Sequence, residues 1–290
     1  RREREGPLWQ SLRRGVHAWH GLDASDPDVR IAAALVDRPE AVLGGWASLR
    51  TQGVDRVDGR TGPGGSSLVP VLLHVGPSGR TRPTVGLDVD RGRLDPRDVL
   101  EVSGVRVTGA SLAVLTVAAQ HGAEEGLVAA DAAVRCGLTS PAALADRVGS
   151  MGRTRGVPAA RVVAALVDRR AASAPESRLR YVWVVEAGLA RPEVNPMLVD
   201  RDGLVVASPD LLDTEAAMAG EYDGSHHREL RQHTADNERE EDIERLGVAV
   251  VRATSVDLWP RRQHLVRRLV DAHGRGLTRD RSRDNWGWVA

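Results

Sequence analysis

The order of helical and strand patterns over residues 173–270 constrains the fold more than any other feature of the chain. A helix is expected over 175–187, because Pro175 suits a first helical turn and Gly188 suits a helix end. The Asp202-Gly203 pair predicts a hairpin turn between two strands. The other predicted elements are strands over 193–199, 204–212, 216–223 and 248–254, and helices over 227–246 and 255–269. We therefore expect an α/β domain with the order αβββαβα.

The first 172 residues also mix strands and helices, in shorter pieces. Asp26 is expected to cap a helix that follows it. The predicted strands are 15–19, 68–75, 84–89 and 99–108, and the predicted helices are 27–37, 45–52, 111–120, 124–135, 141–148 and 158–170. We therefore expect three parts: a small N-terminal region over 1–60, a middle α/β domain over 61–172, and a C-terminal domain over 173–290. The Arg-rich tail from Gly274 is expected to be loosely ordered.

Composition narrows the classes of function. Lys and Arg together number 40 and Asp and Glu together number 40, so the formal net charge is +0 and binding to nucleic acid must depend on local patches. The chain contains no lysine, so every side-chain contact from an aliphatic or guanidinium cation is made by arginine. Its single cysteine, Cys136, fits a buried apolar position in a reducing compartment. Since no apolar stretch is long enough to span a bilayer, we expect a cytoplasmic protein without a membrane partner.

An acid-rich stretch in the C-terminal domain is where chemistry is expected. The two-residue period of a strand places the side chains of Glu221 and Asp223 on one face and Tyr222 on the other. Asp210 lies on the preceding predicted strand, so three carboxylates are expected close together, and a divalent cation relieves their repulsion. The alternative is a solvated sheet end, because Asp-Gly after a strand is ordinary turn chemistry.

This pattern resembles the PD-(D/E)xK nuclease superfamily, which has a restriction-endonuclease-like αβββαβ fold. The chain is also similar to the bacterial family called domain of unknown function 559, which is related to Vsr-type mismatch endonucleases. The residues that carry the resemblance are Glu176-Ser177-Arg178-Leu179-Arg180, Pro209-Asp210-Leu211-Leu212, Glu221-Tyr222-Asp223-Gly224, His226-His227, Asp236-Asn237-Glu238-Arg239-Glu240 and Val251-Arg252-Ala253-Thr254.

The resemblance implies a metal-dependent DNA endonuclease. Asp210 and Glu221 would hold Mg²⁺ or Mn²⁺, the carbonyl of Tyr222 would be a third ligand, and Glu176 would complete the site through water. For Glu176 an alternative is equally open, because an acid in a first helical turn is favoured by the helix dipole alone.

The chain departs from the superfamily at the lysine position, which is Asp223 here. One interpretation gives the task of positioning the attacking water to a histidine, and of His226 and His227 we favour His227. The other makes Asp223 an auxiliary ligand that binds a second cation together with Asp210. The sequence leaves both interpretations open.

Arginines around this stretch are candidates for contacts to the DNA backbone. Arg239 is expected on the helix over 227–246, on a face that can meet the carboxylates or a phosphate. The predicted last helix adds Arg261, Arg262, Arg267 and Arg268. The alternative for these four is a solvated helix face. For Trp259, Trp286 and Trp288, packing is favoured over stacking on bases.

The N-terminal half resembles the region that follows the winged helix in AbiEi-type antitoxins. The residues that carry this resemblance are 12–19, which read LRRGVHAW, and 41–49, which read AVLGGWASL. It implies binding of DNA or of a protein such as a toxin, residues 1–60 as the remnant of a winged helix, and a helix-turn-helix upstream. The alternative to an endonuclease is therefore a non-catalytic antitoxin or transcriptional regulator that retains a degenerate nuclease fold.

Overall fold

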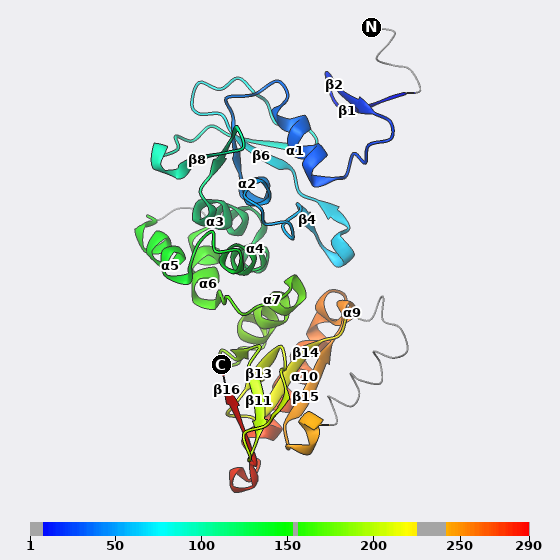
Figure 1. Cartoon of the computed structure of the whole chain (residues 1–290), viewed down its shortest axis with the longest axis vertical. Helices are drawn as coiled ribbons and strands as arrows, with labels where there is room; N and C mark the ends of the chain where they lie inside the picture. Colours follow the sequence, from blue (N-terminus) through cyan, green and yellow to red (C-terminus); the bar gives the residue numbers. More distant parts are fainter. Residues whose placement is uncertain (1–7, 153–155, 225–241, 290) are drawn as a thin grey trace. The chain divides into compact units, whose positions relative to one another are not determined.

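The computed structural model describes residues 8–152, 156–224 and 242–289. It divides into two compact units, Arg1–Ala165 and Leu166–Ala290, which are coloured from blue to green and from green to red in Figure 1. Both units combine helices with sheets, so the chain is an α/β protein, as the sequence predicts. The boundary lies at 165/166 and not at 172/173, and residues 1–60 and 61–165 belong to the same unit.

A five-stranded sheet of order β7-β6-β3-β9-β8 forms the centre of the first unit. Its strands are β3 Val42–Gly44, β6 Val71–His74, β7 Leu87–Asp90, β8 Val99–Val102 and β9 Val105–Thr108. The middle strand β3 pairs antiparallel with β6 and parallel with β9. Because β3 comes from the region before residue 60, that region completes the sheet.

The helices of the first unit begin and end mostly where their caps predict. The Asp26 carboxylate accepts hydrogen bonds from the N–H groups of Asp28 and Val29, and so starts the first helix. The helices are α1 Pro27–Leu35, α2 Gly45–Thr51, α3 Ala110–His121, α4 Ala123–Arg135, α5 Pro141–Ser150 and α6 Val157–Leu166. Two short hairpins accompany them, β1 Trp9–Arg13 with β2 Val16–Trp19 and β4 Arg60–Thr61 with β5 Ser67–Leu68.

The strand expected over 99–108 is a hairpin instead. Strands β8 and β9 pair antiparallel with each other, and the turn between them holds Ser103 and Gly104 at φ 50° and 79°. Both residues adopt the positive φ that a two-residue hairpin turn requires. The alternation of apolar residues continues through the turn, which is why the sequence pattern reads as one strand.

The second unit contains a mixed sheet of order β10-β13-β14-β15. Its strands are β10 Glu193–Val194, β13 Leu211–Asp213, β14 Met218–Tyr222 and β15 Ala249–Ala253. β13 pairs antiparallel with β10 and with β14, and β15 runs parallel to β14. A second sheet of order β12-β11-β16 consists of β11 Met197–Asp200, β12 Val205–Ala207 and β16 Trp286–Val289.

Two expected strands are each divided between these sheets. The strand expected over 193–199 breaks at Asn195, whose φ of 47° is incompatible with an extended strand. The strand expected over 204–212 breaks before β13, where Pro209 has no N–H to donate to a neighbouring strand. The predicted turn at Asp202-Gly203 does join β11 and β12, which pair antiparallel.

The C-terminal residues are more ordered than the sequence predicts. The helix expected over 255–269 is two helices, α9 Ser255–Leu258 and α10 Arg262–Leu277, because Pro260 interrupts it. The tail from Gly274 was expected to be loosely ordered, and this is wrong for the described residues: β16 pairs with β11 along four residue pairs. Arg279 supports this path by an ion pair of 2.7 Å with Asp284.

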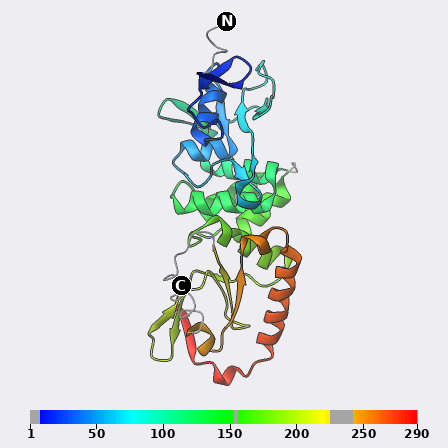
Figure 2. The same cartoon turned by 90° about the vertical axis from the view of Figure 1, so that its right-hand side faces the viewer.

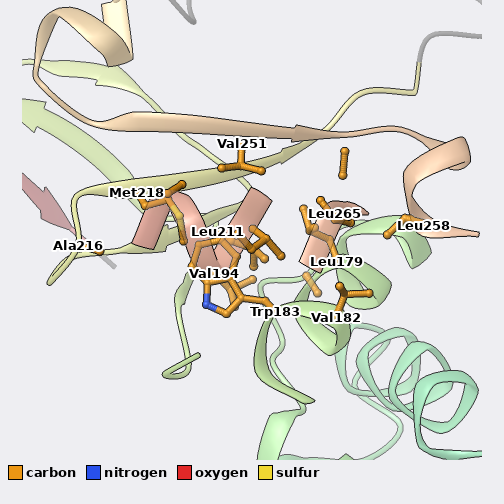
Figure 3. Packing of buried hydrophobic residues seen from close by; sticks show 14 residues of the cluster. Leu179, Val182, Trp183, Val194, Leu211, Ala216, Met218, Val251, Leu258 and Leu265 are labelled. Carbon is orange, nitrogen blue, oxygen red and sulfur yellow. The ribbon is translucent and has the colours of Figure 1, made fainter. Parts of the chain in front are cut away.

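The β10-β13-β14-β15 sheet is buried on both faces. One face packs with α7 Ala174–Tyr181, the π-helical turn Val182–Glu186 that continues it, and α10. Figure 3 shows Leu179, Trp183, Leu211 and Met218 gathered in this cluster, and Figure 2 shows α10 alongside the sheet. The other face packs with a cluster that includes Leu198, Leu212, Ala219 and Ile243. Most of the helix expected over 227–246 lies outside the described residues.

Candidate functional site

Asp210 and Glu221 lie on the same face of the sheet, on neighbouring strands. Leu211 pairs with Gly220 and Leu212 with Ala219, so extending the register by one residue sets Asp210 opposite Glu221. Leu212 and Ala219 both belong to the cluster that contains Ile243. Because side chains alternate along a strand, Asp210 and Glu221 face the same side as these two residues. The structure thus brings these two predicted site residues together.

The Asp210 carboxylate is fixed in place by the neighbouring strand. Its Oδ2 accepts a hydrogen bond of 2.7 Å from the N–H of Tyr222. Its backbone carbonyl accepts a second bond of 3.0 Å from the N–H of Asn195. Since a carboxylate has two oxygens, the bond to Tyr222 does not prevent Asp210 from also binding a cation.

Glu176 is held from a different direction. It lies in the first turn of α7, its side chain is buried, and its Oε2 accepts bonds from the N–H of Ala172 at 2.8 Å and from Nδ2 of Asn195 at 2.9 Å. Asn195 therefore connects Glu176 with the backbone of Asp210. These bonds give Glu176 a structural role, and any role near a metal ion would be through water.

Sequence reasoning missed Asn195. Its side chain also donates to the carbonyl of Arg170 at 2.8 Å, so one amide joins three segments of the chain. The only signal in the sequence is that asparagine tolerates positive φ better than most residues, and this cannot identify its partners.

Tyr222 and Asp223 follow the alternation expected from the sequence. Tyr222 packs against the cluster that contains Leu179 and Trp183, on the face opposite to Glu221. Burial raises the pKa of the Tyr222 hydroxyl, and the charge of Asp223 adds to this. The N–H of Asp223 donates to the carbonyl of Ala253 at 2.8 Å, so pairing with β15 continues one residue beyond β14. Asp223 is thus expected on the face of Glu221.

An arginine lies beside Glu221 on the next strand. The parallel register of β14 and β15 pairs Glu221 with Arg252. Val251 and Ala253 belong to the cluster on the Tyr222 face, so Arg252 between them lies on the Glu221 face. The sequence contains Arg252 in a recognisable stretch but gives it no role, because the pairing of β15 with β14 is a long-range feature.

The described residues do not form a complete metal site of three side chains. Over residues 8–152, 156–224 and 242–289, no three His, Cys, Asp or Glu side chains are grouped so that they could hold a metal ion. Magnesium, however, is commonly bound by one or two carboxylates and several waters. Asp210 and Glu221 fit that donor set. Three predicted site residues, His226, His227 and Arg239, lie outside the described residues.

The predicted DNA-binding arginines of α10 and the residue before it divide into two pairs. Arg262 makes an ion pair of 3.1 Å with Glu186 and lies over the ring of Trp259, at 5.6 Å from its centroid. Arg268 lies 3.7 Å from Asp257. Arg261 and Arg267 are exposed. Trp259 also has Arg178 over its ring, at 5.0 Å, which gives this tryptophan a packing role.

Comparisons with known proteins add relatives but no activity. No family model matches the chain and no solved structure matches it. Two similar curated proteins are MT2308 of Mycobacterium tuberculosis strain CDC 1551 / Oshkosh and Rv2248 of strain ATCC 25618 / H37Rv, both named as uncharacterized proteins. Each is 29% identical over 248 residues, which cover 81% of this chain and 84% of the relative. In the described parts of the chain, no helix is long and apolar enough to cross a membrane.

Proposed function

We propose that the second unit is a metal-dependent endonuclease that hydrolyses phosphodiester bonds of DNA. The observation that carries this proposal is the placement of Asp210 and Glu221 on one face of adjacent strands, with Asp210 anchored on the N–H of Tyr222 at 2.7 Å. Two neighbouring carboxylates repel each other unless a cation or a proton lies between them. A bound divalent cation therefore stabilises this arrangement.

The connectivity of the sheet supports the same proposal. The order β10-β13-β14-β15, antiparallel except for the last pair, is compatible with the αβββαβ order of the superfamily that the sequence resembles. The candidate acids come from the second and third strand segments of that order, where the resemblance expects them. A cytoplasmic location, which a DNA substrate requires, belongs to this proposal.

The role of each residue follows from its position. Asp210 and Glu221 would hold Mg²⁺ or Mn²⁺, assisted by the carbonyl of Tyr222. The cation, when bound, supplies positive charge to the phosphate and lowers the pKa of a bound water. Asp223 would be an auxiliary ligand. His227 or His226 would orient the attacking water, and Arg239 with Arg261 and Arg267 would contact phosphates.

A cleavage assay tests the proposal. Purified protein is incubated with supercoiled plasmid, single-stranded DNA and RNA, each with Mg²⁺, Mn²⁺ or EDTA. We expect plasmid nicking that needs the metal ion and falls at least ~100-fold in Asp210→Asn, since the variant loses a ligand charge. Asp202→Asn, an exposed acid in the β11–β12 turn, should retain activity. Cleavage of RNA alone would replace DNA as the substrate, and no cleavage of any substrate would contradict the proposal.

A non-catalytic regulator or antitoxin is the second candidate. It is favoured by the absence of lysine at the position occupied by Asp223, and by the bonds that hold Glu176 to Ala172 and Asn195. Such a protein would bind DNA, or a toxin or another protein, without cutting. A shift of DNA in a gel that persists with EDTA, together with no cleavage, would favour this candidate over the nuclease.

A further inference from the structure

A cavity in the first unit is separate from the candidate nuclease site. Its volume is about 420 Å³, and it lies over β3, β6 and β9 beside the loop that precedes β8. Cavities of several hundred Å³ are typical of small-molecule sites. The size therefore fits a small organic molecule and excludes a folded partner.

A row of side chains crosses three strands at this cavity. Val42 pairs with His74 on β6, and the register of β3 and β9, which pairs Leu43 with Val107, sets Val42 beside Arg106. All three line the cavity. Neighbouring strands lie about 4.8 Å apart, so the Cα atoms of His74 and Arg106 are roughly 10 Å apart with the apolar Val42 between them.

His74 is buried, with a relative exposure of 6%, and lies at one end of this row. Within the part of the chain that the structure describes, neither ring nitrogen has a hydrogen-bond partner. Nδ1 approaches Oδ2 of Asp90 to 3.4 Å, without hydrogen-bond geometry. Buried polar groups are normally bonded, and leaving one without a partner costs about 1–3 kcal/mol. This cost is explained if a ligand supplies the partner.

The ring is accommodated by a glycine and is expected to be neutral. A Cβ atom on Gly44 would lie 2.5 Å from Nε2 of His74, so only glycine leaves room for the imidazole there. Burial lowers the pKa of His74, and the charge of Asp90 opposes this in part. A neutral imidazole offers one donor and one acceptor to a ligand.

The opposite end of the row carries positive charge. Arg106 is the only cationic side chain among the residues lining the cavity. It donates to the carbonyl of Glu40 at 3.0 Å, but the Glu40 side chain is 92% exposed, so solvent screens its charge. Guanidinium binds carboxylates by paired, charge-assisted hydrogen bonds. The walls between the two ends are apolar, including Val42, Leu94 and Val99.

We propose that this cavity binds a small organic acid with a polar group at its far end. Its carboxylate would bind Arg106, its hydrocarbon body would lie over Val42, and the far hydroxyl or carbonyl would bond to His74. The site belongs to the first unit and does not depend on the proposed nuclease activity, so either proposal can fail alone.

The test uses the full-length chain with 4-hydroxybenzoate as the probe. Benzoate lacks the far hydroxyl, and 4-hydroxybenzamide lacks the charge. Imidazole resonances assigned to His74 by NMR report binding, and calorimetry gives affinities. We expect 4-hydroxybenzoate to shift these resonances and to bind at least ~10-fold more tightly than either analogue, because each analogue loses one polar contact.

Two variants complete the test. Arg106→Gln should weaken 4-hydroxybenzoate at least ~10-fold, and His74→Gln should remove its preference over benzoate. Arg161→Gln, an exposed arginine on α6 away from the cavity, should bind like the parent chain. The proposal is overturned if the probe leaves the His74 resonances unmoved at millimolar concentration, or if the amide binds as tightly as the acid. Because Arg106 is at the rim, its variant is informative even if His74→Gln does not fold.

Discussion

Asn195 is the residue that most directly couples the candidate site to the scaffold. Its backbone has φ 47°, its N–H bonds to Asp210, and its side chain bonds to Glu176 and to the carbonyl of Arg170. A non-glycine residue at positive φ costs energy unless local bonds offset it. Here the side-chain amide provides these bonds, so asparagine has both a conformational and a bonding role.

Two substitutions separate these roles. Asn195→Ala loses the amide bonds and keeps an unfavourable φ, so we expect the free energy of unfolding to fall by roughly 2–4 kcal/mol. Asn195→Gly loses the same bonds but adopts the same φ freely, so it should be about 1 kcal/mol more stable than the alanine variant. Urea denaturation of both variants measures the difference. Equal stabilities would show that backbone conformation is unimportant at this position.

Arg252 is expected to matter for activity rather than for stability. It lies beside Glu221 in a chain without lysine, where it can place positive charge next to a phosphate. Arg252→Met should reduce the rate of plasmid nicking by roughly 10- to 1000-fold, and Arg252→Lys should restore part of it. Arg201→Met, an exposed arginine in the β11–β12 turn, is the matched control. If the methionine and control variants nick equally fast, Arg252 has no role in catalysis.

At the scale of elements, Asp168 ties the segment after α6 to the segment before β10. Its carboxylate binds Arg170 at 3.1 Å and Arg191 at 3.3 Å. Burial acts to raise the pKa of Asp168, but hydrogen bonds and charge from Arg170, together with the charge of Arg180, outweigh it and hold the pKa below its ordinary value. The folded state thus favours the charged carboxylate.

This lowered pKa predicts how stability depends on pH. A group with a lowered pKa in the folded state stabilises that state above its unfolded pKa of about 3.9, and the contribution is lost as pH falls through the folded pKa. Asp168→Asn should therefore lower the free energy of unfolding by roughly 1–3 kcal/mol near neutral pH. The difference from the parent chain should shrink as the pH falls below about 4. Urea titrations at several pH values measure it, and a difference that does not change with pH would contradict this role.

The sequence predicts most elements well but not how they are divided and paired. Helix starts such as α1 follow from a local cap, Asp26, and the turn at Asp202-Gly203 follows from local chemistry. The breaks at Asn195 and Pro209 are also local, but apolar alternation on both sides conceals them. Pairing of β16 with β11 joins residues far apart in the chain, and no periodicity encodes it.

The same distinction applies to the site. The alternation of Glu221, Tyr222 and Asp223 needs only the period of a strand, and the structure follows it. The register that sets Glu221 beside Arg252, and the bonds of Asn195, depend on which segments meet in the folded chain. These features cannot be derived from spacing within one element.

At the scale of the whole molecule, the two units carry different chemistry. The first has a cavity with a buried histidine and one arginine, and the second has paired acids at a sheet. The net charge of +0 gives neither unit a general attraction to nucleic acid, so affinity for DNA must come from local arginines. We therefore expect DNA binding by this protein to weaken steeply with salt, in proportion to the few phosphates contacted.

The central claim is that Asp210 and Glu221 jointly hold one divalent cation. Titration with Mn²⁺, followed by electron paramagnetic resonance of the free ion, measures this without any need for catalysis. The account predicts a site in the parent chain that is lost in Asp210→Asn and in Glu221→Gln and retained in Asp202→Asn. Binding that is absent from the parent chain, or that persists unchanged in both site variants, would contradict it.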